Sequence, residues 1–191
     1  MINVTLKDGK VLEVEKGRSI LEVAKQISEG LARMATCGEV NGKVEDLRYE
    51  LDKDCTLNIC TFENSEEGKK AYWHTTAHIM AQAIKRLFPN VQLAIGPAIA
   101  NGFYYDFDTE HRFSEDDFEK IEAEMKKIIK EDLPLERFEL SREESIKLMK
   151  EAKESYKVEL IEELPEGEVI SFYKQGEYVD LCAGPHLMST G

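Results

Sequence analysis

The chain of 191 residues lacks the features that would direct it to a membrane or to secretion. No apolar run approaches the roughly 18 residues that a membrane-spanning helix requires. The opening stretch "MINVTLKDGKVLEVEKG" alternates polar and apolar residues, without the apolar core or cleavage site of a signal peptide. Its four cysteines follow no regular framework, so we expect reduced thiols, a cytoplasmic location and no membrane partner.

Positive charge is also scarce. The chain has 25 Lys and Arg against 38 Asp and Glu, a net charge of −13. Residues 1–62 carry a net charge of only −2, which leaves −11 on the remainder. This balance excludes a broad phosphate-binding surface. A nucleic-acid partner would therefore be contacted locally, or through other parts of a larger protein.

Residues 1–62 predict a small β-grasp domain. Asp8-Gly9 is a strong turn dipeptide between two alternating strands, and Asn41-Gly42 marks a second tight turn. Ser19–Glu22 has the pattern of a capping box and starts a helix that we expect to end at Gly30. An apolar strand at 55–62 closes the unit. It contains no catalytic combination of residues.

Residues 63–191 predict a second, α+β domain after a polar link at 63–70. A helix should run from about Glu66 to Phe88, where Pro89 stops it, and shorter helices should begin at Ser114 and Ser141. The helix after Ser114 should turn its apolar residues inward, namely Phe118, Ile121, Met125, Ile128 and Ile129. The segments "SYKVELIEEL", "GEVISFYKQG" and "EYVDLCAGPH" read as strands. The predicted fold is therefore α+β, with helices packed on a mainly antiparallel sheet.

Two pairs of potential metal ligands lie about a hundred residues apart. His74 and His78 in "HTTAH" are one helical turn apart at the edge of an apolar stripe, so we expect both to be half-buried on one face. Cys182 and His186 flank a Gly-Pro turn in "CAGPH". Alone, the first pair also fits an ordinary solvated or hydrogen-bonded pair. Together, the two pairs predict one centre on which all four side chains converge, with donors that suit zinc.

Several other residues fit purely structural roles at this point. Asp180 fits a turn at a strand end, Lys157 a solvent-facing strand position, and His111 a solvated loop. Tyr104 and Tyr105 fit the aromatic face of a sheet. Cys37, Cys55 and Cys60 read as small buried residues.

The segments "HTTAH", "IGPAIANGFYYDF", "SYKVEL" and "YVDLCAGPH", taken together, closely resemble the N-terminal region of bacterial-type threonyl-tRNA synthetases. The resemblance covers essentially the whole chain: residues 1–62 resemble the TGS domain and residues 63–191 the editing domain. Editing domains of alanyl-tRNA synthetases share both histidine motifs. The preceding TGS-like unit and "NGFYYDF" are the features that favour the threonyl type.

This resemblance implies a hydrolase that removes serine from mischarged tRNA(Thr). By position it implies a site made of His74, His78, Lys157, Asp180, Cys182 and His186, with Gly96, Tyr104 and Tyr105 lining the substrate pocket. Thr75 stands where the family often has Ser. The class II aminoacylation core, with its ATP and zinc, is absent, and we expect the end of the editing domain to lie beyond residue 191. The implied partners are the serine-carrying 3′ end of tRNA(Thr) and the rest of a synthetase that is homodimeric through its core.

A physical reason for such a site is the small difference between serine and threonine. One missing methyl group discriminates by only about 1–3 kcal/mol, so a second pocket is needed to hydrolyse the misloaded ester. An ordered imidazole and the Lys157 ammonium suit water activation and oxyanion stabilisation. The residues do not decide which group takes the proton, and a vicinal ribose hydroxyl is another candidate.

The role of metal stays open between two interpretations. Lys157 would repel Zn²⁺ but would stabilise a developing oxyanion, so we expect a metal-free site. The alternatives are a zinc-dependent editing domain for another small amino acid, with Zn at His74, His78, Cys182 and His186, and a non-catalytic TGS-type binding module with a structural metal site.

Overall fold

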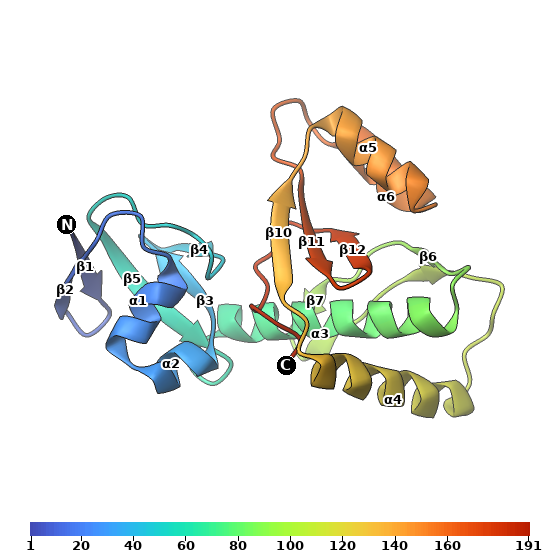
Figure 1. Ribbon diagram of the computed structural model, residues 1–191, viewed down its shortest axis with the longest axis horizontal. Helices are drawn as coiled ribbons and strands as arrows, with labels where there is room; N and C mark the ends of the chain where they lie inside the picture. The colour runs from blue at the N-terminus through green and yellow to red at the C-terminus, as the bar shows by residue number, and fades with distance from the viewer. The chain divides into compact units, whose positions relative to one another are not determined.

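The computed structural model describes all 191 residues, and they form two compact units (Figure 1). The first unit comprises Met1–Trp73 with Gly184–Leu187, and the second comprises His74–Ala183 with Met188–Gly191. Helices and antiparallel-rich sheets occur in the chain, which confirms the predicted α+β class. No helix is long and apolar enough to cross a membrane.

The first unit is built on a five-stranded sheet of order β2-β1-β5-β3-β4. The neighbouring strands β1 and β5 run parallel, and the other neighbours are antiparallel. This is the β-grasp plan expected from the sequence. The strands are β1 (Ile2–Leu6), β2 (Val11–Val14), β3 (Ala35–Val40), β4 (Lys43–Glu45) and β5 (Cys55–Thr61).

The two predicted turns of this unit are present. Gly9 has φ +87° between β1 and β2, and Asn41 and Gly42 have φ 51° and 81° between β3 and β4. At Asn41-Gly42 both central positions have positive φ, which matches the right-handed twist of a hairpin and which Asn-Gly tolerates best. These turns therefore form where local chemistry alone predicts them.

The helical part of this unit corrects one prediction. Helix α1 (Ile20–Ile27) starts at the Ser19 cap as expected, but it ends at Ser28 rather than at Gly30. The Ser28 hydroxyl accepts the N–H of Leu31 and starts helix α2 (Glu29–Met34), which contains Gly30. A serine N-cap satisfies a free N–H of the new helix, so it starts a second helix where a glycine suggested an end.

Helix α3 (Glu66–Leu87) agrees within one residue with the predicted helix, and its residues from His74 onward belong to the second unit. The other helices are α4 (Glu115–Glu131), α5 (Arg142–Glu151) and α6 (Ser155–Glu163). The strands are β6 (Gln92–Leu93), β7 (Ala98–Ile99), β8 (Gly102–Phe103), β9 (Phe107–Asp108), β10 (Leu135–Glu139), β11 (Ser171–Gln175) and β12 (Tyr178–Leu181).

The main sheet of the second unit is antiparallel, of order β10-β11-β12, as predicted. Two-stranded pairs form between β6 and β9 and between β7 and β8. Helices α3 and α4 pack together through an apolar cluster that includes Ile84, Ile121 and Ile128. Helices α5 and α6 cover the sheet through Met149, Ile161 and Phe172.

The segment around Lys157 corrects the prediction of a strand. Residues 155–163 form helix α6, and Lys157, Val158 and Ile161 are its buried residues. The β-branched residues favoured a strand, but Val158 and Ile161 also have the i, i+3 spacing of a helix face. Packing of that face against α5 and β11 decides the outcome.

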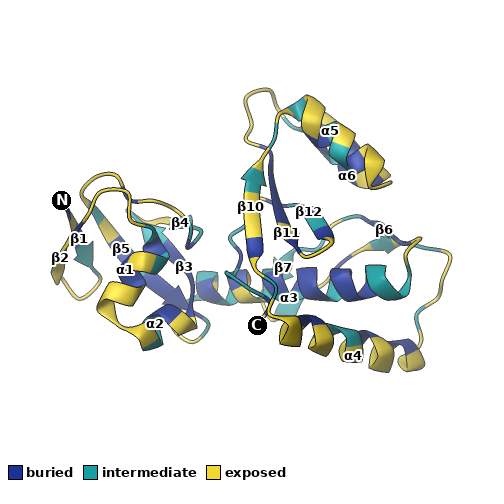
Figure 2. Ribbon diagram, viewed as in Figure 1, coloured by how far each residue is buried: buried dark blue, intermediate teal, exposed yellow.

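Helix α4 shows a narrower buried face than the sequence suggested. Ile121 and Ile128 are buried, whereas Phe118 and Ile129 are exposed, with 54% and 43% of their surface accessible. In Figure 2 most of the α4 ribbon has the colour of exposed residues. At about 100° per residue, the five apolar positions span an arc of about 100°, with Phe118 and Ile129 toward one edge and Ile121 and Ile128 toward the other. The neighbouring elements therefore cover only one edge of this stripe. Cys55 is also only partly buried, unlike Cys37 and Cys60.

Candidate functional site

A buried carboxylate, Asp180 on β12, lies at the centre of the candidate site. Its Oδ2 accepts hydrogen bonds from the hydroxyls of Tyr105 (2.7 Å) and Tyr178 (2.8 Å). Its Oδ1 lies 3.0 Å from the Lys157 ammonium. Burial would raise the pKa of Asp180, but Lys157, His78 and Tyr105 outweigh it and hold the pKa below its usual value. Asp180 is therefore an ionised carboxylate inside the unit, not a turn-forming residue.

The His78 imidazole on α3 faces this carboxylate, with Nε2 3.3 Å from Asp180 Oδ2. The residue is 2% exposed, so the expectation of a half-buried His78 is wrong. Burial lowers its pKa to about 3, although Asp180 opposes the shift. His78 is thus neutral near pH 7 and can donate its Nε2 proton to Asp180.

His74, one turn earlier on α3, is half-buried as expected. Its ring centre lies 5.3 Å from that of His78. Burial, assisted by the charge of Lys157, lowers the pKa of His74, while Asp180 acts in the opposite direction. A neutral, partly accessible imidazole can accept a proton, so His74 has the properties of a general base.

Cys182, directly after β12, lies beside His74, with Sγ 3.3 Å from Nε2. The strand fixes its backbone, because Cys182 exchanges hydrogen bonds with Ser171 on β11. One potential ligand atom from each of His74, His78 and Cys182 lies within 4.8 Å of the others. These three residues combine nitrogen and sulfur donors of the kind that bind zinc.

The Lys157 side chain is 5% exposed, so it is not the solvent-facing residue that its local sequence suggests. Helix α6 directs it to Asp180, and its ammonium lies 5.5 Å from the centre of the Tyr105 ring. The pairing neutralises a charge that would otherwise be costly to bury. The Lys157 ammonium, although paired with Asp180, still contributes to the lowered pKa of His74 and of His78.

The three residues predicted to line a substrate pocket have different surroundings. Tyr105 is buried against Gly96, where an added Cβ would lie 2.1 Å from the tyrosine ring. Tyr104 is instead 41% exposed. The pKa of Tyr105 is raised by burial and by the Asp180 charge, so its hydroxyl stays protonated and donates. Gly96 is therefore required for the ring of Tyr105 to occupy its position.

His186 is the fourth potential ligand of the sequence motifs, and it is fully buried. It lies in the segment Gly184–Leu187, which groups with the first unit. Its main-chain N–H donates to Asp46, and its carbonyl accepts from Arg48. His111 is exposed in a loop, as expected, although its Nε2 lies 2.9 Å from Asp117 and its ring stacks on Phe88.

Two residues of this region, Tyr178 and Gln82, are not singled out by the sequence motifs. Tyr178 fits a plain strand position, yet its hydroxyl donates to the carboxylate two residues later. Gln82 is 1% exposed and exchanges hydrogen bonds with Gln175. A signal for Gln82 does exist in the spacing, because His74, His78, Gln82 and Arg86 follow one another at intervals of four along α3.

Comparisons with known proteins give two matching family models and several similar proteins. Residues 2–61 match the TGS domain, and residues 170–191 match the threonyl and alanyl tRNA synthetase second additional domain. The chain is 67% identical over 191 residues to a threonine–tRNA ligase of Acetivibrio thermocellus, covering 100% of this chain and 30% of that protein. It is 66% identical over 188 residues to that of Caldanaerobacter subterraneus subsp. tengcongensis, covering 98% and 29%.

A threonine–tRNA ligase of Clostridium perfringens is 62% identical over 189 residues, covering 99% of this chain and 29% of that protein. The chain thus spans about 30% of the length of the curated relatives that it matches. With matches to the TGS domain and to the second additional domain, and 61–67% identity over its whole length, it is similar to the N-terminal region of bacterial threonine–tRNA ligases.

Proposed function

We propose that this chain hydrolyses the ester of serine mischarged onto tRNA(Thr). The observation that carries the proposal is a cluster of neutral imidazoles beside a buried Lys157–Asp180 pair, in a chain that matches threonine–tRNA ligases. Burying such groups is costly, and perturbed ionisable groups of this kind gather at functional sites. The whole ligase's tRNA charging needs parts that lie outside these residues.

In the proposed reaction, water attacks the carbonyl carbon of the ester and the bond to the ribose oxygen breaks. His74 takes the proton of the attacking water, since it is neutral and half-buried. Lys157 supplies positive charge for the developing oxyanion. Asp180 orients His78 by accepting from its ring, and Tyr105 and Tyr178 hold Asp180 in place. His74 then gives this proton to the ribose oxygen as the ester bond breaks, which leaves free serine and tRNA(Thr) with its ribose hydroxyl restored.

We propose that this chemistry proceeds without a metal, because the Lys157 ammonium, paired with Asp180, lies in the same buried region. A specific observation favours the alternative of zinc: His74, His78 and Cys182 offer ligand atoms within 4.8 Å of one another. His78 also faces a carboxylate, as zinc-bound histidines often do. Zinc held by these residues would polarise water. Metal content of protein purified without chelator, and hydrolysis after chelation, distinguish the two cases.

The test compares Ser-tRNA(Thr) with Thr-tRNA(Thr) under single-turnover conditions with the chain in excess. We expect the seryl ester to be hydrolysed well above its spontaneous rate and the threonyl ester to remain at background. Equal rates on both esters would refute the specificity. Background rates on both, with a full-length threonine–tRNA ligase as an active control, would refute the activity.

A further inference from the structure

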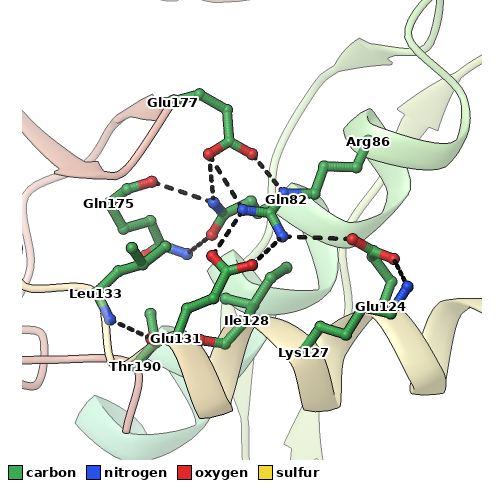
Figure 3. A network of polar contacts seen from close by, with 10 residues as sticks. All are labelled: Gln82, Arg86, Glu124, Lys127, Ile128, Glu131, Leu133, Gln175, Glu177 and Thr190. Atoms are coloured by element: carbon green, nitrogen blue, oxygen red, sulfur yellow. Dashed lines mark hydrogen bonds and ion pairs between the residues drawn. The ribbon is translucent and has the colours of Figure 1, made fainter.

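One face of α3 carries four polar residues at intervals of four, each paired with the β11–β12 hairpin or the residue after it. His74 contacts Cys182, and His78 contacts Asp180. Farther along, Gln82 bonds to Gln175 and Glu177, and Arg86 bonds to Glu177 (Figure 3). We name this set the polar seam: His74, His78, Gln82 and Arg86 on the helix, with Cys182, Asp180, Gln175 and Glu177 as partners.

The spacing of the polar seam follows from backbone geometry. Four helical residues advance about 6 Å, and two strand residues advance about 6.6 Å. A helix running antiparallel to β12 therefore meets every second strand residue with every fourth helical residue. His74 and His78 pair in this way with Cys182 and Asp180.

Next to the two histidines, the polar seam contains a buried pair of amides. Gln82 and Gln175 are each 1% exposed, and Gln175 Nε2 donates to Gln82 Oε1 at 2.8 Å. Gln82 Nε2 in turn donates to the Gln175 carbonyl at 3.2 Å. Gln175 Oε1 finds no hydrogen-bond partner among the protein atoms. Two apolar side chains would fill this space without that cost, so the pair is a poor device for stability alone.

The last residue of the polar seam, Arg86, connects α3 to α4 as well as to the β11–β12 hairpin. Arg86 pairs with Glu177 in the β11–β12 turn and with Glu124 and Glu131 on α4 (Figure 3). Gln82 also donates to Glu177 at 3.2 Å. Hydrogen bonding to Arg86 lowers the pKa of Glu177 to about 2, so this carboxylate stays charged over the whole physiological range.

We propose that Gln82 and Arg86 are positioning residues, which fix the register of α3 on the β11–β12 hairpin so that His74 and His78 meet Cys182 and Asp180. Apolar contacts tolerate small slides and rotations of a helix, whereas hydrogen bonds depend on distance and direction, so the polar residues of α3 keep their partners at only one position of the helix. Rotation or a slide by one residue would remove every partner at once. Only the expected effect on the rate of hydrolysis rests on the proposed function; the positioning of the histidines does not.

The test uses the whole chain and three variants: Gln82→Leu, the double variant Gln82→Leu with Gln175→Leu, and the control Ile84→Leu. Ile84 lies on the same helix but packs against α4. The single variant leaves Gln175 unpaired and should lower the melting temperature. The double variant removes both partners and should recover most of that loss. The control should lower the melting temperature only slightly and should leave hydrolysis unchanged.

The double variant is the informative one, because we expect it to recover most of its stability and yet to lose the fixed register of α3 on the β11–β12 hairpin. We expect its limiting single-turnover rate on Ser-tRNA(Thr) to fall roughly 10- to 100-fold. Its half-saturating chain concentration should stay unchanged. The imidazole NMR signals of His74 and His78, readable because the chain has only four histidines, should shift in position and in titration.

The NMR result separates the two proposals. If the native chain hydrolyses no seryl ester, the proposed function fails, yet the histidine signals still report whether the amide pair sets the register. Shifted signals in the double variant would support the seam. A double variant with native histidine signals and native turnover would overturn it.

Discussion

The two units differ in what they bury. In the first unit the buried polar residues are two threonines, Thr36 and Thr61, and the single histidine His186. Within His74–Ala183 the buried polar set includes a lysine, an aspartate, a glutamate, a histidine and two glutamines: Lys157, Asp180, Glu154, His78, Gln82 and Gln175. A β-grasp core needs only apolar contacts, whereas ionisable groups inside a core are costly and mark chemistry. The contrast favours the second unit as the location of the proposed reaction.

The largest expected effect is on hydrolysis, by substitution of His74. We expect His74→Ala to lower the single-turnover rate on Ser-tRNA(Thr) by roughly 10²–10⁴-fold, the usual contribution of a general base. Circular dichroism and melting temperature should remain close to native, because the side chain is only half-buried. His111→Ala is the matched control and should keep full activity. Loss of folding together with activity would instead indicate a structural histidine.

The buried Lys157–Asp180 pair of the second unit can be tested through its effect on stability. Lys157→Met leaves Asp180 buried and without its cation, so we expect a loss of about 3–5 kcal/mol in the free energy of unfolding. The exposed Lys174 on β11 gives the control, and Lys174→Met should change this free energy by less than about 0.5 kcal/mol. Urea unfolding measures both. Similar losses in the two variants would contradict the pairing.

A fall in pH should destabilise the second unit more than the first. Below about pH 6.5 the unfolded chain protonates His78, but the folded chain does not until its pKa of about 3. The folded state then binds fewer protons, so the second unit should lose up to about 1.4 kcal/mol per pH unit as pH falls from 6.5 toward 3. The lowered pKa values of His74 and Asp180 act in the same direction.

Backbone amide NMR signals can follow each unit through urea unfolding at several pH values. Met1–Trp73 contains no histidine, so this segment serves as the internal control. An equal decline of both units with falling pH would mean that the buried imidazoles do not govern the acid response.

The smallest effect is expected in the first unit. Ser19 caps α1 by accepting the N–H of Glu22 at 3.1 Å. We expect Ser19→Ala to cost about 1 kcal/mol in the free energy of unfolding and to leave hydrolysis unchanged. Thermal unfolding and the deacylation assay test both statements. A change in hydrolysis with no change in stability would contradict the assignment of the reaction to the second unit.

The sequence by itself determined the elements whose causes are local. Turns at Asp8-Gly9 and Asn41-Gly42, caps at Ser19 and Ser141, and the stop before Pro89 depend on residues within one turn of each other. The β-grasp order, the long helix α3 and the antiparallel sheet follow from such signals. The spacing of the two motifs is also enough to single out His74, His78, Cys182 and His186 as potential ligands.

Only the tertiary structure decided where the buried charges lie. Lys157 sits in a segment whose local pattern fits a strand as well as a helix, and packing against α5 and β11 selected the helix that directs it inward. Tyr105 and Asp180 are 75 residues apart in sequence, so no local pattern could predict their hydrogen bond. The physical reason is that burial and ionisation depend on neighbours from distant elements, whereas turns and caps depend on the residues beside them.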